Sequence, residues 1–229
     1  MTVSDALAKG RTTFMGLELA VVPGVLVPRA ESELLACTAL SLLRGMSTDS
    51  PRVIDICTGA GNLACTIASR VTGAAVWCSD LTDNSVAVAR ANVQQLGLAD
   101  RVVIAQGDLF AGLHGLGLED SIDLIVCNPP YISQKRLLEG DRTSLLAEEP
   151  REAFDGGPYG LSIHQRVVKE ALPFLRAGGL LAVEFGLGQD RQVRILFERA
   201  GTYEDIHSVA NESGAARVIH GRKHMGPGA

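Results

Sequence analysis

The chain has 229 residues, a length that suits one α/β domain with a short extension. Hydrophobic residues make up 46%, aromatic residues only 4%, and there are 25 glycines, a composition typical of a sheet wrapped by small-residue helices with tight connections. The formal net charge of −5 excludes a broad positive field for nonspecific nucleic-acid binding. Nucleic acid is therefore not expected as a partner.

The five cysteines are odd in number, form no Cys-x-x-Cys pair and lie mostly within apolar stretches. This pattern predicts reduced, buried thiols, and the histidines lack ligand spacing, so no metal is expected. The chain starts without a basic stretch followed by an apolar core, and no run reaches 18 apolar residues. We expect a cytoplasmic protein that does not enter a membrane.

Residues 1–50 are predicted to form an N-terminal extension made of a hairpin and a helix. Residues 14–28 resemble two short strands separated by a turn at Pro23-Gly24, which predicts a hairpin lid. Residues 31–44 follow with leucines at helical spacing, which predicts a helix that leads into the sheet.

Arg29 and Glu33 lie one helical turn apart at the start of that helix. An ordinary surface ion pair is the favoured interpretation. Because the pair follows the predicted lid directly, both residues are also candidates for contact with a substrate.

From Arg52 onward, strand and helix patterns alternate. Strands are predicted at 52–56, 75–79, 101–106, 122–127, 180–186, 203–209 and 216–221, and helices at 62–71, 83–97, 160–176 and 188–200. Alternation of this kind predicts a Rossmann-like, doubly wound, seven-stranded, mostly parallel sheet within residues 51–222. Residues 210–215 are too few for a crossover helix, so the last strand should be antiparallel to its neighbour. The tail 223–229 is expected to be flexible.

A glycine-containing loop follows the first strand of the predicted sheet, where Asp55, Thr58, Gly59 and Gly61 predict close approach of a nucleotide-like ligand. The glycines also fit a loose dinucleotide fingerprint, with Asp80 about twenty residues on, so a dehydrogenase has to be considered. Asp55 would repel a pyrophosphate but attract a cationic amino-acid end. This favours a ligand such as S-adenosylmethionine.

Two further acids follow the next two strands. Asp80, with Leu81 beside it, ends the second strand, where its oxygens can accept hydrogen bonds from both ribose hydroxyls. Asp108 and Leu109 follow the third strand, where the carboxylate can accept from an adenine amine while the leucine packs on the ring. These four residues are candidate cofactor contacts, although each acid could also be an ordinary surface or turn residue.

Asn128-Pro129-Pro130-Tyr131 closes the apolar run 122–127. The prolines remove two backbone donors, which leaves the Asn128 side chain and the Pro129 carbonyl as acceptors for an amino group. Two acceptors that hold an NH2 favour its pyramidal, nucleophilic form, and Tyr131 offers a ring to cover its flat face. The alternative for the motif alone is a tight turn after a strand.

With these motifs, the chain resembles the class I S-adenosylmethionine-dependent methyltransferases, and more narrowly the protein-(glutamine) methyltransferases that modify peptide-chain release factors. The resemblance covers about residues 14–222. It rests on segments in the family's order, namely 25–35, 55–61, 128–132, Glu148-Glu149-Pro150, Gly156-Gly157, Gly160-Leu161, 183–186 with Gln189, and 217–219.

The resemblance implies S-adenosyl-L-methionine as cofactor and methyl transfer to an amide or amine nitrogen, with a protein glutamine as the expected acceptor. It implies catalytic roles for Asn128, Pro129 and Tyr131, with Asn128 also beside the cofactor. Pro130 and Tyr159 join Arg29 and Glu33 as candidate substrate contacts.

Three departures from the family's pattern bear on the acceptor. The bacterial family normally has a helical docking domain that has no counterpart here, Cys57 replaces a usual glycine, and Pro158-Tyr159 alters a loop. A partner protein in place of the docking domain, a small-molecule acceptor, and a reaction on the cofactor itself therefore remain open alternatives. Adenine-specific nucleic-acid methyltransferases, which also carry Asn-Pro-Pro-Tyr, are a further one.

Overall fold

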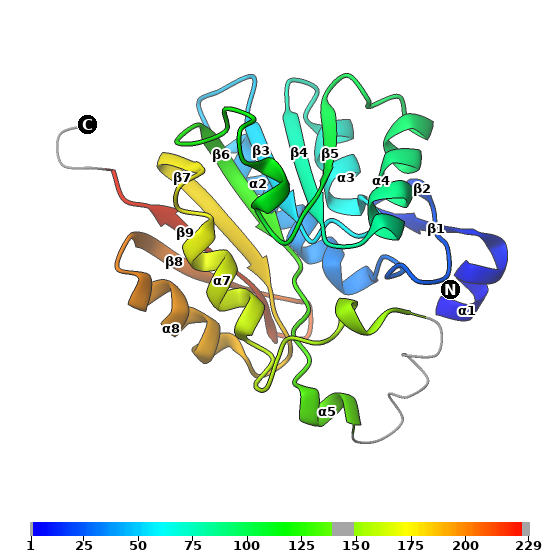
Figure 1. Ribbon diagram of the computed structural model, residues 1–229. Coiled ribbons are helices and arrows are strands. Elements are labelled where there is room, and N and C mark those ends of the chain that lie inside the picture. The colour runs from blue at the N-terminus through cyan, green and yellow to red at the C-terminus, as the bar shows by residue number, and fades with distance from the viewer. Residues whose placement is uncertain (1, 139–148, 226–229) are drawn as a thin grey trace.

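The structure is a computed structural model that describes residues 2–138 and 149–225. Its centre is a seven-stranded sheet with helices on both faces, and an N-terminal helix and two-stranded hairpin lie beside it (Figure 1). The strand order is β5-β4-β3-β6-β7-β9-β8. The first five strands of this order are parallel, whereas β9 pairs antiparallel with both β7 and β8. The predicted Rossmann-like sheet with an antiparallel last strand is confirmed.

The sheet strands are β3 (Arg52–Ile56), β4 (Ala75–Asp80), β5 (Val102–Gln106), β6 (Ile122–Cys127), β7 (Leu175–Glu184), β8 (Tyr203–Ala210) and β9 (Ala216–Lys223). The α-helices are α1 (Val3–Lys9), α2 (Glu33–Arg44), α3 (Asn62–Arg70), α4 (Asp83–Gln95), α5 (Gln134–Leu138), α7 (Ser162–Glu170) and α8 (Asp190–Ala200). Short 3-10 helices span Ala30–Ser32, Ala111–Leu113 and Arg151–Ala153. The hairpin is formed by β1 (Arg11–Phe14) and β2 (Leu17–Ala20).

Alternating side chains of the sheet build a separate apolar core on each face. Val53 points into a core that contains Leu35 of α2 and residues of α3 and α4. Its neighbour Ile54 points into the other core, which contains Val167 of α7 and Phe197 of α8. Figure 1 shows α7 and α8 together in front of the sheet. Both faces are therefore covered, and the remaining place for a ligand is an edge where strands end.

The N-terminal segment differs from the prediction. The hairpin turns at Met15 and Gly16, which have φ values of 50° and 79°, and not at Pro23-Gly24. Positive φ at both central residues is the geometry of a two-residue hairpin turn, but methionine rarely adopts it, so the residue types gave no signal. The predicted N-terminal hairpin is therefore present, but over residues 11–20 and not over 14–28. Phe14 and Leu19 are buried in the main core, so the hairpin packs into the domain.

The predicted helix 160–176 is also wrong in its second half. Helix α7 ends at Glu170, and β7 begins at Leu175, five residues before the predicted strand. Pro173 lies between them, and a proline cannot continue a helix because it lacks a backbone N–H.

At the other end of the chain, β9 extends to Lys223, the first residue of the predicted tail, and residues 226–229 of that tail lie outside the described residues.

The chain changes direction in the sheet between β3 and β6. From β3 the chain moves outward through β4 to β5, and then returns so that β6 pairs with the free side of β3. At such a switch point the connections after the two strands leave in opposite directions and open a crevice at their carboxyl ends. The loops that begin at Cys57 and Asn128 flank this crevice.

Asn92 on α4 joins the hairpin to the loop after β3. This fully buried side chain accepts from the backbone N–H of Ala20 at 2.7 Å, and its Nδ2 donates to the carbonyls of Ala20 and Ala60 at 3.1 and 2.8 Å.

We predict that Asn92→Ala lowers the free energy of unfolding by about 2–4 kcal/mol, because each unsatisfied buried polar group costs about 1–3 kcal/mol. Urea denaturation measures the loss. Asn84→Ala, an exposed amide on the same helix, is the matched control. Equal losses in the two variants would contradict the structural role of Asn92.

Candidate active site

The loop after β3 is shaped by residues in the left-handed region. Cys57, Gly59 and Gly61 have φ values of 59°, 54° and 80°. This region favours glycine, so the cysteine stands where a glycine would be less strained. The backbone N–H of Gly59 donates to Asp80 Oδ2 at 2.8 Å, which fixes the loop against the end of β4.

Asp55 lies fully buried below this loop. Its Oδ2 accepts from the Thr58 hydroxyl at 2.6 Å and from the Ala64 backbone N–H at 3.1 Å, while its Oδ1 has no hydrogen-bond partner among the described residues. Burial raises the pKa of Asp55 to about 7, against the opposing effect of those two bonds. The carboxylate supports the loop from below and does not itself line the cavity above it.

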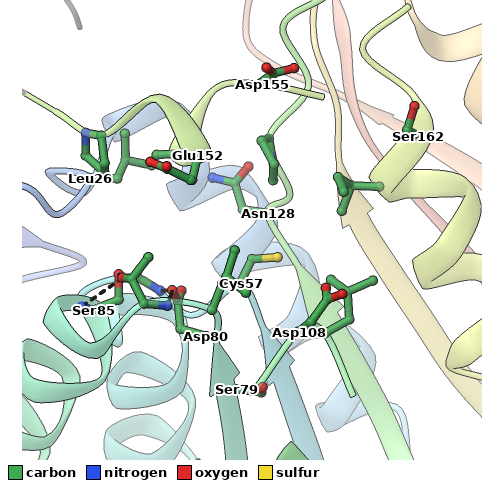
Figure 2. A pocket seen from close by; sticks show the side chains of 18 of the residues that line it. Leu26, Cys57, Ser79, Asp80, Ser85, Asp108, Asn128, Glu152, Asp155 and Ser162 are labelled. Atoms are coloured by element: carbon green, nitrogen blue, oxygen red, sulfur yellow. Dashed lines mark hydrogen bonds between the residues drawn. The ribbon is translucent and has the colours of Figure 1, made fainter. Parts of the chain in front are cut away.

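A cavity of about 420 Å³ opens above the carboxyl ends of β3, β4, β5 and β6. Of the residues predicted to contact a cofactor, it is lined by Gly59, Asp80, Leu81, Asp108, Leu109 and Asn128. Figure 2 shows Asn128 on the opposite side of this space from Asp80 and Asp108, with Cys57 between them. Pro130 and Leu26 add to its walls. Thr58 and Gly61 contribute through the loop and not as lining residues.

Asp108 differs from Asp80 in its partners. Both of its oxygens accept from Arg166 Nη1 of α7, at 2.9 and 3.0 Å, although both side chains are about half exposed. In the part of the chain that the structure describes, Asp80 instead accepts only from backbone N–H groups, those of Gly59 and, at 3.3 Å, of Thr82. Asp80 is therefore held in place by the backbone, whereas Asp108 is held by a cation on a facing helix.

A second cavity of about 360 Å³ lies on the other side of Asn128. Its walls include Pro129 and Tyr131 of the predicted catalytic motif, together with Arg29 and Arg217. The two cavities share three lining residues, Leu26, Asn128 and Ala153. The Asn-Pro-Pro-Tyr segment thus stands between two spaces, with Pro130 facing the first and Pro129 the second.

Polar contacts fix the side chains of the motif. The Asn128 Nδ2 donates to the Ser32 hydroxyl at 2.8 Å. The Tyr131 hydroxyl donates to Glu184 Oε1 at 3.4 Å and accepts from Arg217 Nη2 at 3.2 Å. Burial raises the pKa of Tyr131 to about 12, so this phenol stays protonated at neutral pH.

Arg29 and Glu33 do not pair with each other, contrary to the prediction. Arg29 forms an ion pair with Glu149, whose other oxygen accepts from the Val27 backbone N–H at 2.8 Å. Glu33 instead accepts from the Met15 N–H at 2.9 Å in the hairpin turn. The pairing partner is some 120 residues away in sequence, which helical spacing cannot reveal. Glu149 thereby joins the segment before α2 to the segment after β6.

The structure separates the predicted substrate residues. Arg29 lines the second cavity and Pro130 the first, whereas Glu33 and Tyr159 line neither, and Tyr159 is 84% exposed. Sequence reasoning assigned no site role to Ser32, Glu149, Glu184 or Arg217. Glu184 carried a usable signal, because it lies between the apolar run 180–183 and Gly186, as Asp55 lies before a glycine-containing loop.

Among residues 2–138 and 149–225, no group of three or more His, Cys, Asp or Glu side chains is placed to hold a metal ion. All five cysteines are free, and three are buried, but Cys37 is exposed, contrary to the prediction for the thiols in general. In the same part of the chain no helix is both long and apolar enough to cross a membrane.

Comparison with known proteins identifies the family. The chain is 37% identical over 212 residues to the "Release factor glutamine methyltransferase" of Moorella thermoacetica, covering 92% of this chain and 71% of the relative. It is 38% identical over 214 residues to the protein of the same name from Bordetella pertussis, covering 93% of this chain and 75% of that relative. The chain belongs to the release factor glutamine methyltransferase family.

A family model agrees with this assignment, and a solved structure agrees with the fold. The family model described as "Methyltransferase small domain" matches residues 31–158. A crystal structure of a methyltransferase from Pyrococcus furiosus has the same fold, with a TM-score of 0.64 and 17% identity, covering 97% of this chain and 96% of that one. The protein is an S-adenosylmethionine-dependent enzyme, and the dehydrogenase alternative falls away.

The first cavity fits the cofactor of a methyltransferase. S-adenosylmethionine combines a cationic amino-acid end with a ribose and an adenine, and the cavity offers acids together with an apolar surface at Leu81 and Leu109. The buried Oδ1 of Asp55, which has no hydrogen-bond partner among the described residues, lies below the loop, where a bound cation would favour the charged form of the carboxylate. The residues present therefore suit this ligand.

We predict that Asp55→Asn makes the ligand-free methyltransferase more stable than the wild type, by a difference in the free energy of unfolding that grows as pH rises from 4 to 7. The folded-state pKa of about 7 exceeds the ordinary value of 3.8, so the native protein holds a proton that the unfolded chain has released between pH 4 and 7. Wild type therefore loses stability relative to Asp55→Asn across this window, by up to about 4 kcal/mol, since one pKa unit corresponds to about 1.4 kcal/mol.

Urea denaturation from pH 4 to pH 8 measures this difference. Asp83→Asn, an exposed acid on α4, controls for the loss of one carboxylate. If the difference in the free energy of unfolding between wild type and Asp55→Asn stays constant with pH, the raised pKa of Asp55 is contradicted.

Proposed function

We propose that this methyltransferase transfers a methyl group to the side-chain amide nitrogen of a glutamine in a protein of the release-factor class. The observation that carries the proposal is the position of Asn128, which lines both cavities. One space takes the cofactor, the other takes the acceptor, and the two reactants meet beside a side chain that can hold an amide NH2. The names of the relatives support glutamine as the acceptor.

The residues of the motif divide the work at the acceptor. Asn128 Oδ1 and the Pro129 carbonyl accept hydrogen bonds from the amide NH2 and turn its lone pair toward the first cavity. The Tyr131 ring bounds the second cavity and covers the plane of the amide. The bound cofactor supplies an electrophilic sulfonium methyl group. The amide nitrogen would gain one N–C bond as the sulfur–methyl bond breaks with its electron pair left on sulfur, and it would lose one proton to solvent, so the products would be a neutral N-methylated amide and a neutral thioether.

The cofactor is held by residues of the first cavity. Asp80 accepts from the ribose hydroxyls, and Leu81 and Leu109 pack against the flat faces of the ligand. The loop of Thr58, Gly59 and Gly61 gives the amino-acid end close access to the backbone, with Asp55 below it as the balancing charge. Asp108 contributes an acceptor for the adenine amine beside its ion pair with Arg166.

The N-terminal region, residues 1–50, supplies a segment that covers the site in residues 51–222. Leu26 lines both cavities, and Glu149 holds this segment through Val27 and Arg29. A cover that excludes water favours methyl transfer to the amide over side reactions. Since the hairpin packs into the main core, the part that serves as a cover is the segment 21–29. A partner protein that brings the acceptor is compatible with this arrangement.

We predict that Asn128→Ala lowers kcat on a release factor about 10²- to 10³-fold, by analogy with the loss of one preorganised polar group. Affinity for S-adenosylhomocysteine should stay nearly unchanged, because other residues supply most of the first cavity. Mass spectrometry detects the product as a 14-dalton gain on the glutamine of the Gly-Gly-Gln loop, and calorimetry measures the affinity. Gln94→Ala, an exposed amide on α4, is the control.

A comparison of three acceptor conditions tests the substrate class. Wild-type enzyme is given the release factor, single-stranded adenine oligonucleotides, or no acceptor. Methylation of the oligonucleotide alone, or consumption of the cofactor without any acceptor, would overturn the proposal of protein methylation.

A further inference from the structure

Gln189 is the residue immediately before α8 and lines the second cavity, and the proposed function gives it no role. Its side-chain Oε1 accepts from the Gly186 backbone N–H at 2.8 Å, and its own backbone N–H donates to the Gly186 carbonyl at 3.1 Å. The two residues therefore close a tight turn between β7 and α8. Because the side-chain oxygen is occupied within this turn, the amide nitrogen is left for partners outside it.

That nitrogen connects the turn to two other loops. Gln189 Nε2 donates to the Tyr131 carbonyl at 3.0 Å, in the loop after β6, and to the Gly160 carbonyl at 3.4 Å, in the loop before α7. Both partners are carbonyl oxygens, which only accept hydrogen bonds, so this place requires a donor. An amide supplies both the acceptor for Gly186 and the donor for the two carbonyls, whereas a carboxylate of the same shape supplies acceptors alone.

The three loops pack closely where they meet Gln189. A Cβ added to Gly160 would lie 2.4 Å from the Tyr131 carbonyl oxygen and 2.9 Å from Gln189 Nε2. A Cβ added to Gly186 would lie 2.9 Å from Gln189 Oε1 and 3.0 Å from Cδ2 of the Tyr131 ring. Glycines at both positions therefore allow Gln189 and Tyr131 to come together. The edge of the Tyr131 ring lies against the backbone at Gly186.

The Asn-Pro-Pro-Tyr segment depends on anchors from outside itself. Pro129 and Pro130 have no backbone N–H to donate, and their rings fix φ. At one end of the segment, the Asn128 side chain is held by a hydroxyl of the segment before α2. At the other end, Gln189 holds the carbonyl of Tyr131. With both ends held and few free torsions between them, the Pro129 carbonyl has a fixed position.

We propose that Gln189 is a positioning residue for methyl transfer, because its amide nitrogen holds the Tyr131 carbonyl and so sets where the Pro129 carbonyl and the Tyr131 ring meet the acceptor. The proposal rests on the proposed function, in which these groups hold the acceptor NH2. Tyr131 is then fixed at two points, since its hydroxyl accepts from Arg217 Nη2 at the far end of the ring. Without the donor at 189, the segment is free to turn and the ring leaves the plane of the acceptor amide.

Gln189→Glu tests the donor directly, because the variant keeps the length of the side chain and the acceptor for Gly186. With a full-length bacterial release factor at pH 8, we expect kcat to fall about 10²-fold, the scale of a misplaced catalytic group. KM for the release factor and affinity for S-adenosylhomocysteine should change far less than kcat. Gln94→Glu, the same change at an exposed position on α4, is the matched control and should leave kcat unchanged.

Gly186→Ala disturbs the same contacts without removing the amide. Its methyl group would press on Gln189 Oε1 and on the Tyr131 ring, so kcat should fall about tenfold or more. Gly45→Ala is the control for this variant, because the nearest atom to its Cβ would lie 3.4 Å away, at ordinary contact distance.

A second readout does not depend on turnover. The chain has three tyrosines, so ¹³C-tyrosine labelling gives few ring signals, and Tyr131→Phe assigns those of Tyr131. The Tyr131 signals should shift in Gln189→Glu and in Gly186→Ala. The Tyr203 ring, whose centroid lies 5.0 Å from that of Phe197 on α8, reports whether this helix stays packed. Its signals should remain as in wild type.

Unchanged Tyr131 signals, or full activity in Gln189→Glu, would overturn the proposal. Shifts of the Tyr203 signals as large as those of Tyr131 would also overturn it, because Gln189 would then serve the packing of α8. If the Tyr131 signals alone shift but the wild type does not methylate the release factor, Gln189 positions Tyr131 as proposed and the proposed function fails.

Discussion

The parallel pairing of β3 with β6 is the constraint on which the site depends. In this register Asp55 pairs with Val126 and Ile56 with Cys127, so the loops that follow the two strands leave the sheet side by side. One loop carries the glycines of the first cavity, and the other carries Asn128 and its prolines. Because both strands are buried on both faces, their ends cannot shift independently. The distance between the two cavities is therefore set by backbone hydrogen bonds.

Two buried acids, Asp55 and Glu184, follow from this arrangement at a cost in stability. Each lies at or near the end of a central strand, each is almost fully buried, and burial raises the pKa of each to about 7. An apolar residue would pack as well without the cost of a buried charge. Their presence is understandable if Asp55 balances a cationic ligand and Glu184 holds the Tyr131 hydroxyl beside the second cavity, which is the exchange of stability for function that active sites often make.

The sequence predicted the parts of the site that local rules describe. Asp80, Asp108 and Asn128 follow strands whose apolar patterns are clear, and the switch point brings such strand ends together. The hairpin turn at Met15 and the partner of Arg29 were not predictable, because the first uses an unusual residue for positive φ and the second depends on a contact across the whole chain. The hydrogen bond between Asn128 and Ser32 likewise joins two distant segments, which no spacing rule records.

The most direct measurement of the central claim is a crystal structure with S-adenosylhomocysteine and a peptide that carries the Gly-Gly-Gln loop. The account predicts the cofactor product in the cavity of Asp80, the peptide in the cavity of Tyr131 and Arg217, and the glutamine amide nitrogen within hydrogen-bond distance of Asn128 Oδ1. A glutamine bound elsewhere, or an Asn128 whose nitrogen faces the acceptor, would contradict it.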